Sequence, residues 1–390
     1  MRVLHLFSNS KWTGPAEPAL NLCWRLRGLG VEAEFACAPD AGKSVNRVVE
    51  SARERGIEPI LEFHLRKHRH PLKNFLDVRR LRRYLHEHPV DIVHCHLDND
   101  HEIAARALRG LDIPLVRTSY EGVGLAPNRR RRAMMARTAV LIEPSEMARE
   151  HDVEIYGLRL EQVAVAPNAI DTKRFDPKRA LNLSPPAIPA NAGIQDLRAR
   201  WNIPADAYVV GIVARMQTHR HFEDLLEATK WLIEVVPNTH LLIVGRGTNQ
   251  KTVVEQPARE LGIADHVHIT GYVEGDELIA AIQSFDVGVY LVPGSDGTCR
   301  AAREILSMGK PLVVADRGML REIVVDGESG VVTDGRPASL FDALEGLGGE
   351  PERRTQMGAA ARVLAETRYT LEVQAAAVHA IYGRMLSFLS

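Results

Sequence analysis

Short apolar runs alternate with longer amphipathic stretches along almost the whole chain, and this alternation constrains the fold more than any other feature. In the first half, residues 3–7 and 91–96 are strand-sized runs, and a helix is expected over 17–29. In the second half, strands are expected at 209–214 and 241–244. Strands that alternate with helices favour parallel sheets covered by helices on both faces. We therefore expect an α/β fold with doubly wound, Rossmann-like domains.

The length of 390 residues predicts two such domains, because one hydrophobic core stops growing well below this size. The segment 169–207 is rich in proline and has little apolar periodicity, which is typical of a linker. It separates a first domain at 1–168 from a second at 208–370. Residues 371–390 show a helical period and predict a terminal helix that crosses back to the first domain, with packing on the second domain as the alternative. Ligands of open α/β sheets bind at strand carboxyl ends, so a working cleft is expected between the domains.

The charge balance argues against a nucleic-acid binder. Lys and Arg number 49 against 50 for Asp and Glu, so the net charge is -1 and the basic excess that drives binding to phosphate backbones is missing. The four cysteines have no CxxC spacing. The chain begins with a strand-like run rather than a signal peptide. No apolar run approaches the roughly 20 residues of a membrane span. A cytoplasmic protein with free thiols is expected.

Two stretches of the second domain suit phosphate binding. Residues 292–304 pass from a strand through a glycine-containing loop into a helix, whose free N–H groups and positive dipole end favour anions. Glu304 in that helix can reach sugar or ribose hydroxyls. Arg215 and Arg220 follow another strand, and two guanidiniums can neutralise a diphosphate. An ordinary capped helix and a pair of surface arginines are the alternatives.

These residues also carry a family resemblance. Asp296-x7-Glu304, Gly309-Lys-Pro311 and the segment 322–330 lie in the second domain, and the Gly14-Pro-Ala-Glu17 loop lies in the first. In these motifs the chain resembles the retaining glycosyltransferases of family 4, which have the GT-B fold of two Rossmann-like domains facing a central cleft. The resemblance covers most of the chain and is more specific in the second domain.

The resemblance implies transfer of a sugar, with retention at the anomeric carbon, from a nucleoside-diphosphate sugar, a UDP-sugar above all, to a glycan or glycolipid acceptor. Neither a metal ion nor a cofactor is implied, since fixed positive charge stabilises the leaving group. The implied setting is cell-surface polysaccharide or lipopolysaccharide synthesis. The implied catalytic residues are Arg215, Arg220 and Asp296; the donor-binding residues are Glu304, Gly297, Thr298, Cys299, Arg300, Gly245, Tyr272 and Val273; the acceptor or sugar side has Gly14, Pro15, Glu17, His94, His96 and Tyr120.

Three positions depart from the family pattern. Asp296 stands where Glu is usual, Arg220 where Lys is usual, and Tyr120 where a His is usual, which bears on the donor sugar and on the acceptor. A GT-B nucleotide-sugar epimerase and a non-catalytic nucleotide-sugar-binding module are the alternatives. A dehydrogenase is disfavoured, because no Gly-x-Gly-x-x-Gly follows the first strand of either half.

Two further features of the first domain have two interpretations each. His94 and His96, with the acidic residues that follow them, could bind a metal, but a cleft-lining or packing role is favoured. The basic clusters at 64–73 and 129–137 could be solvated surface. In the resembling enzymes this domain receives the acceptor, so the clusters could instead make a peripheral contact with an anionic membrane at its inner face.

Overall fold

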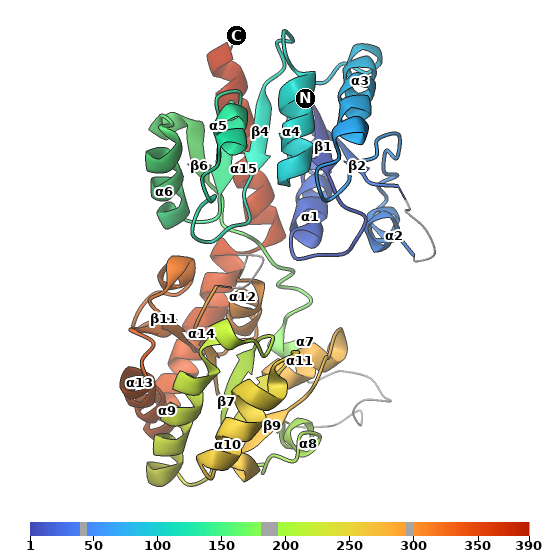
Figure 1. The fold of residues 1–390 in the computed structure, drawn as a ribbon. Helices are drawn as coiled ribbons and strands as arrows, with labels where there is room; N and C mark the ends of the chain where they lie inside the picture. The colour runs from blue at the N-terminus through green and yellow to red at the C-terminus, as the bar shows by residue number, and fades with distance from the viewer. Residues whose placement is uncertain (40–44, 181–193, 294–298, 390) are drawn as a thin grey trace. The chain divides into compact units, whose positions relative to one another are not determined.

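The computed structural model describes residues 1–39, 45–180, 194–293 and 299–389, and the chain forms two compact units (Figure 1). The N-terminal unit contains Met1–Ala169 and the terminal helix, and the C-terminal unit runs from Ile170 to Thr370. Each unit is built on one six-stranded parallel sheet. The predicted α/β class with two Rossmann-like domains is confirmed.

The N-terminal sheet has the strand order β2-β1-β3-β4-β5-β6. Its strands are β1 (Arg2–Phe7), β2 (Glu32–Cys37), β3 (Ile92–Cys95), β4 (Leu115–Thr118), β5 (Val140–Glu143) and β6 (Val163–Val165). The helices are α1 (Ala16–Arg27), α2 (Arg47–Glu54), α3 (Pro71–Glu87), α4 (Asp98–Ala107), α5 (Arg129–Met135), α6 (Glu146–Tyr156) and α15 (Leu371–Leu389). Helices α1, α2 and α15 bury apolar side chains on one face of the sheet, and α3, α4 and α5 cover the other.

The C-terminal sheet has the order β12-β11-β10-β7-β8-β9. Its strands are β7 (Tyr208–Val213), β8 (Thr239–Val244), β9 (Val267–Ile269), β10 (Val287–Tyr290), β11 (Leu312–Ala315) and β12 (Gly330–Thr333). The helices are α7 (Pro177–Ala180), α8 (Ile194–Ala199), α9 (Phe222–Val235), α10 (Gln256–Glu260), α11 (Asp276–Gln283), α12 (Arg300–Ser307), α13 (Pro337–Gly349) and α14 (Pro351–Arg368). Helices α9, α10 and α13 pack on one face, and α8, α11, α12 and α14 on the other. Both faces of the sheet are therefore apolar, which explains the continuous hydrophobic strands.

The segment expected to be a linker packs on the C-terminal unit where it is described. Ile170, Phe175, Leu197 and Ile203 are buried in the same core as α11 and α12. Arg198 anchors the segment further, because its guanidinium donates to Ser284 O at 3.2 Å and to Asp286 Oδ2 at 2.8 Å. A few buried apolar residues thus fix the described parts of this segment, 169–180 and 194–207, to the C-terminal unit.

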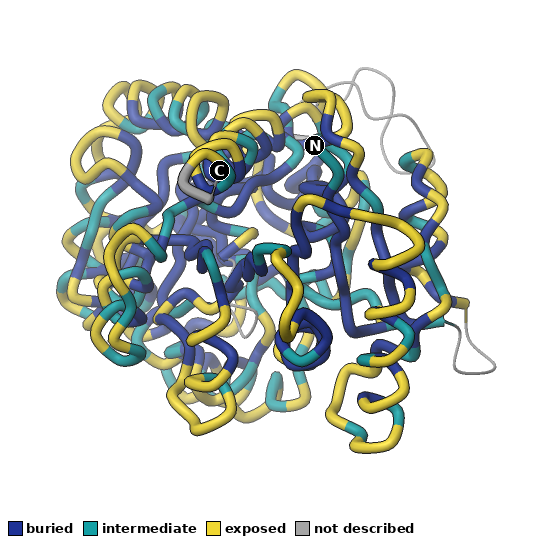
Figure 2. The backbone as a smooth tube through the Cα atoms, turned by 90° about the horizontal axis from the view of Figure 1, so that it is seen from above, coloured by how far each residue is buried: buried dark blue, intermediate teal, exposed yellow. Residues whose placement is uncertain are grey.

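The terminal helix α15 packs in the N-terminal unit, far from it in sequence (Figure 1). Ile381, Tyr382 and Met385 are buried among the side chains of α1 and β1, and Gln374 Nε2 donates to Pro167 O at 3.0 Å. In Figure 2 the buried backbone, in dark blue, lies in the interior, whereas exposed stretches, in yellow, lie on outer turns of the tube. Among the described residues, no helix combines the length and apolar character needed to cross a membrane.

Candidate functional site

The carboxyl ends of the C-terminal strands form one edge of that sheet, because all six strands are parallel. Most donor-site residues predicted from the sequence lie along this edge or at the start of α12. Arg215 follows β7, Gly245 follows β8, Tyr272 and Val273 follow β9, and Cys299, Arg300 and Glu304 lie at α12. Asp296, Gly297 and Thr298 lie outside the described residues. The fold thus brings together, at one sheet edge, residues that are far apart in the sequence.

Arg220 is the most distinctive cation of this edge. Its side chain is almost fully buried just before α9, and its Nη1 donates to Val292 O and Pro293 O, both at 3.3 Å. Its Nε is buried without a hydrogen-bond partner, and no carboxylate of the described residues forms an ion pair with it. Arg215 is exposed nearby in sequence. A buried guanidinium with a spare donor at a helix N-terminus is suited to hold an anion.

Glu304 is buried in the second turn of α12. Its Oε1 lies 3.2 Å from Arg300 Nε on the preceding turn, and only about 4% of the residue is exposed. The helix begins after Cys299, which has a left-handed backbone with φ 46. His221 at the start of α9 has the same conformation, with φ 57. Such conformations cost about 1–3 kcal/mol for a residue with a Cβ and cluster at functional sites, so both loop-to-helix junctions are candidates for function.

The loops after β8 and β9 complete this edge. Gly245 has φ +142, and a Cβ at this position would lie 2.3 Å from Ala214 O, so only glycine lets the two loops approach this closely. Tyr272 is 60% exposed, its hydroxyl donates to Glu274 Oε2 at 2.8 Å, and the Arg246 guanidinium lies 4.9 Å from its ring centroid. An exposed ring flanked by a guanidinium offers a flat surface for a nucleotide base.

In the N-terminal unit, three histidines form a buried cluster: His5 on β1, His94 on β3 and His96 directly after β3. His5 and His94 are register partners, and the His94 and His96 rings stack with centroids 4.5 Å apart. His5 Nδ1 lies 3.0 Å from His96 Nε2, and His96 Nδ1 lies 2.7 Å from the Tyr120 hydroxyl. His94 bonds through its two ring nitrogens to the hydroxyls of Thr118 and, on α15, Tyr382. The structure therefore places His94, His96 and Tyr120 inside the unit, joined to one another.

This burial determines the charge and the metal-binding capacity of the cluster. Loss of solvent lowers the pKa of His5 to about 3 and lowers the pKa of His94 and His96 well below the usual range, so the rings are neutral at pH 7. The nitrogens are close enough for a metal ion, but every one except His5 Nε2 is already hydrogen bonded. Of the cleft-lining and packing roles that the sequence favoured over a metal centre, packing fits this buried geometry better.

The predicted loop Gly14-Pro-Ala-Glu17 opens α1. Pro15 is the N-cap residue of the helix, and Ala16 N donates to Thr13 O at 2.8 Å. Gly14, Pro15 and Glu17 are half-buried. They follow β1 at the carboxyl edge of the N-terminal sheet, together with Tyr120 after β4.

Sequence reasoning missed a buried pair of carboxyl groups at this edge. Glu143 ends β5, and its carboxyl group is fully buried beside that of Asp152. Burial, and then the neighbouring Asp152 carboxylate, raise the pKa of Glu143 well above its usual range. Asp152 Oδ1 accepts from Leu125 N at 2.8 Å and lies 2.7 Å from His151 Nδ1. A single Glu in a short strand gives no sequence signal of such burial.

This pair predicts a pH dependence of stability. A carboxyl group whose pKa is raised by folding stabilises the protein fully below its ordinary value of 4.5 and loses that contribution as pH rises through the folded pKa. Glu143→Gln keeps the shape of the side chain without its charge. The melting temperature of this variant minus that of wild type is therefore expected to increase as pH rises from about 4.5 to 8. Glu150→Gln, an exposed change on α6, is the control and should follow wild type. Parallel melting curves for Glu143→Gln and wild type at every pH would contradict the assignment.

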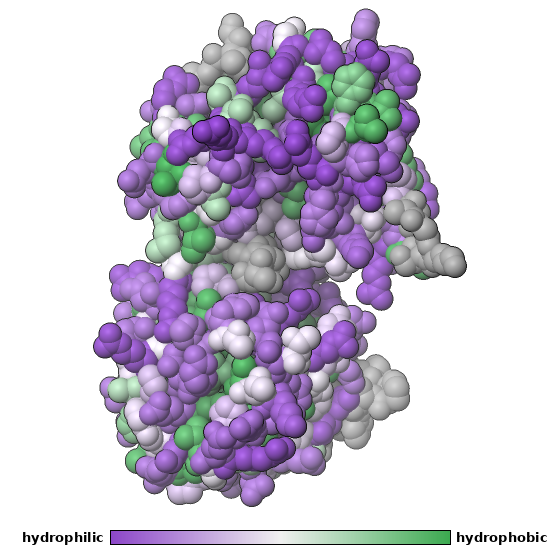
Figure 3. All heavy atoms as spheres, in the orientation of Figure 1, coloured by the Kyte–Doolittle hydropathy of each residue, from purple (hydrophilic) through white to green (hydrophobic). Residues whose placement is uncertain are grey.

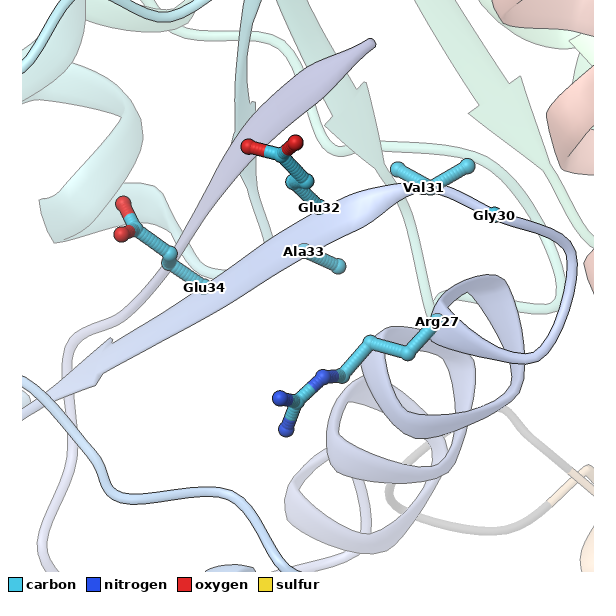
Figure 4. Close-up of a pocket in the computed structure, with 6 residues that line it drawn as sticks. All are labelled: Arg27, Gly30, Val31, Glu32, Ala33 and Glu34. Atoms are coloured by element: carbon cyan, nitrogen blue, oxygen red, sulfur yellow. The ribbon is translucent and has the colours of Figure 1, made fainter.

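A surface hollow lies elsewhere, at the amino end of the edge strand β2 (Figure 4). It is lined by Arg27, Gly30, Val31, Glu32, Ala33 and Glu34. Figure 4 shows the Arg27 side chain extending from α1 along one side of the strand, with the carboxylates of Glu32 and Glu34 on the other side. Because ligands of parallel sheets bind at the carboxyl ends of strands, we do not assign the hollow to the site.

Two parallel sheets, each with chemistry-bearing loops at its carboxyl edge, define a two-domain protein of the GT-B class. The model of the family described as "Glycosyl transferases group 1" matches residues 193–364, and that of "Glycosyltransferase Family 4" matches residues 13–174. Together they span most of the chain. The chain belongs to glycosyltransferase family 4 and is a glycosyltransferase.

Named relatives agree with this family. A D-inositol 3-phosphate glycosyltransferase of Xylanimonas cellulosilytica is 27% identical over 75% of this chain and 72% of its own. Among solved structures, Anabaena Alr3699/HepE in complex with UDP superposes with a TM-score of 0.77 at 18% identity, covering 100% of this chain and 99% of the other. WaaG, a glycosyltransferase involved in lipopolysaccharide biosynthesis, gives a TM-score of 0.63 at 16% identity, covering 98% and 100%. These two structural likenesses show the shared fold.

Proposed function

We propose that this chain is a retaining glycosyltransferase that moves a sugar from a UDP-sugar to a glycan or glycolipid acceptor in cell-surface polysaccharide synthesis. The observation that carries the proposal is Arg220, a buried cation with a spare Nε donor and no carboxylate partner among the described residues. Such a group is costly to bury unless an anion meets it. A nucleoside diphosphate at the same sheet edge is the anion that suits the family.

The reaction proposed here uses fixed positive charge in place of a metal ion. Arg220, with Arg215 beside it in sequence, would stabilise the charge that develops on the departing diphosphate. Glu304 would accept hydrogen bonds from ribose hydroxyls, and Tyr272 would lie against the base. The HepE complex with UDP and the involvement of WaaG in lipopolysaccharide biosynthesis support the donor and the setting.

The proposal is tested by nucleotide-dependent thermal stabilisation. The purified protein is melted with UDP, GDP or ADP in the presence of EDTA, because a ligand that binds the folded state raises the melting temperature. Stabilisation by UDP is expected. Stabilisation by GDP or ADP alone would overturn the proposal of a UDP-sugar donor. If no nucleotide at millimolar concentration shifts the melting temperature, the proposed transferase activity is overturned. Incubation with a UDP-sugar and no acceptor then tests for an epimerase, which would convert the donor by itself.

We also propose that the N-terminal unit contacts an anionic membrane at its cytoplasmic face through α3 and the loop before it. Leu72, Phe75 and Leu76 are exposed on this helix, and Figure 3 shows apolar side chains over α3 among hydrophilic ones. Between residues 63 and 86 the only acid is Asp77, which is buried, whereas eight lysines and arginines are exposed or half-exposed around the apolar ones. These are Arg66, Lys67, Arg69, Lys73, Arg79, Arg80, Arg82 and Arg83. Apolar side chains flanked by basic ones are typical of an interfacial helix.

The membrane contact predicts a specific loss of vesicle binding. The double variant Leu72→Ser/Phe75→Ser should bind vesicles of phosphatidylglycerol and phosphatidylcholine about tenfold or more weakly, because each large apolar side chain contributes about 1.5–3 kcal/mol when buried. Val363→Ser, on the exposed side of α14, is the control. Co-sedimentation measures the binding, which should also fall with added salt. Equal binding by the double variant and wild type would exclude this surface.

A further inference from the structure

Two arginines from different elements hold the backbone that follows β10. Arg220 Nη1 donates to Val292 O and Pro293 O, both at 3.3 Å, and Arg317 Nη1 donates to Leu291 O at 3.4 Å. These distances are at the long end of the hydrogen-bond range, but the donors are charged. Three consecutive carbonyl groups, leading directly into residues 294–298 of the predicted donor loop, are thus bound by guanidinium groups.

Arg317 lies two residues after the end of β11, where its guanidinium is held by several neighbours. Its Nη2 lies 3.6 Å from Asp224 Oδ2 and donates to Gly335 O at 3.4 Å. Gly335 has φ +75, and a Cβ there would lie 3.1 Å from Arg317 Cζ and 2.6 Å from Ala315 Cβ. The guanidinium therefore occupies the space that a larger residue at position 335 would need.

Asp224, in the first turn of α9, contacts Arg317 and also His221, the residue that follows Arg220. Its Oδ2 lies 3.0 Å from His221 Nδ1 in addition to 3.6 Å from Arg317. His221 has a left-handed backbone with φ 57 and directly follows Arg220, so its conformation determines how Arg220 is oriented relative to α9. The contact with Asp224 helps to hold that costly conformation.

The charges of the cluster are unequally matched. Asp224 faces both Arg317 and His221, whereas Arg220 has no carboxylate partner among the described residues. Asp224 therefore offsets the charge of Arg317 and leaves the charge of Arg220 for an external anion. Arg317 is suited to a structural task beside the site rather than to binding the anion itself.

We propose that Arg317, acting through Asp224, is a positioning residue that holds the backbone of residues 291–293 and the Arg220 guanidinium in the geometry that binds the donor diphosphate. The inference rests on the proposed function, because it assumes that Arg220 meets the diphosphate. The sequence gives no sign of it, since residues 220, 291 and 317 become neighbours only through the order of β7, β10 and β11 in the sheet.

The test is a double-mutant cycle on UDP affinity, measured by calorimetry with the full chain. Arg317→Ala is expected to weaken UDP binding about five- to tenfold, and Asp224→Asn should act in the same direction. Arg317→Ala added to Arg220→Ala should cause little further loss, because the positioned group is then already missing. A general structural role would not produce this coupling. Arg321→Ala is the matched control, since it removes an exposed arginine from the adjoining turn, where it pairs with Asp316 at 3.2 Å.

The outcomes separate this inference from the proposed function. If Arg220→Ala leaves UDP binding unchanged, the proposed function fails and the positioning role fails with it. If Arg220→Ala weakens binding but Arg317→Ala does not, or if the two losses add in full, only the positioning role is overturned. Melting temperatures are measured for each variant, and Arg317→Gln, which keeps most of the side-chain stem, replaces Arg317→Ala in the cycle if the alanine variant does not fold.

Discussion

Replacing Arg220 with alanine is expected to lower kcat for sugar transfer by about 10²–10³, the range seen when one fixed donor to a developing negative charge is removed. The expected loss is larger in kcat than in the KM of the donor, because the diphosphate becomes more negative as the sugar departs. Steady-state kinetics with a UDP-sugar and an acceptor measure both constants. Arg259→Ala, which removes one exposed positive charge from α10, is the control.

Arg220→Lys separates charge from geometry at the same position. Lysine keeps the positive charge but not the fork with which Arg220 donates to Val292 O and Pro293 O. We expect an intermediate kcat, with part of the loss caused by the freed backbone of residues 292–293. A kcat for Arg220→Ala equal to that of wild type would remove Arg220 from the reaction.

Replacing Glu304 with alanine is expected to raise the KM of the donor about 10- to 100-fold, because hydrogen bonds to charged groups contribute about 1.5–3 kcal/mol. Glu304 is buried, and it lies 3.2 Å from Arg300, so its carboxylate is held in place before a ligand arrives. The effect should fall mainly on KM, since ribose lies away from the bond that breaks.

Glu304→Gln and an exposed control complete this experiment. Glutamine keeps the length of the side chain and one acceptor oxygen, so it should lose less donor affinity than alanine. Glu328→Ala, on the surface of the same unit, should behave as wild type. A donor KM for Glu304→Ala within twofold of wild type would remove Glu304 from the donor site.

Local patterns predicted the fold class well, because secondary structure depends on short-range periodicity. The strand expected at 209–214 is β7, Tyr208–Val213, and the helix expected over 17–29 is α1, Ala16–Arg27. Motif resemblance identified the family, which the family models confirm. The sequence predicted a linker at 169–207 but not that its described residues, such as Phe175 and Leu197, would be buried in the core of the C-terminal unit, because their apolar spacing has no period.

The sequence by itself determined the α/β class, the family and the positions along the chain where phosphate chemistry was expected, since these depend on local periodicity and on motifs a few residues long. Only the tertiary structure decided which side chains meet. His94 lies 288 positions from Tyr382, its hydrogen-bond partner, and Arg317 reaches Leu291 and Asp224 across separate elements. The physical reason is that burial, pKa shifts and hydrogen-bond partners arise from long-range packing, which brings together residues whose separation along the chain shows no local pattern.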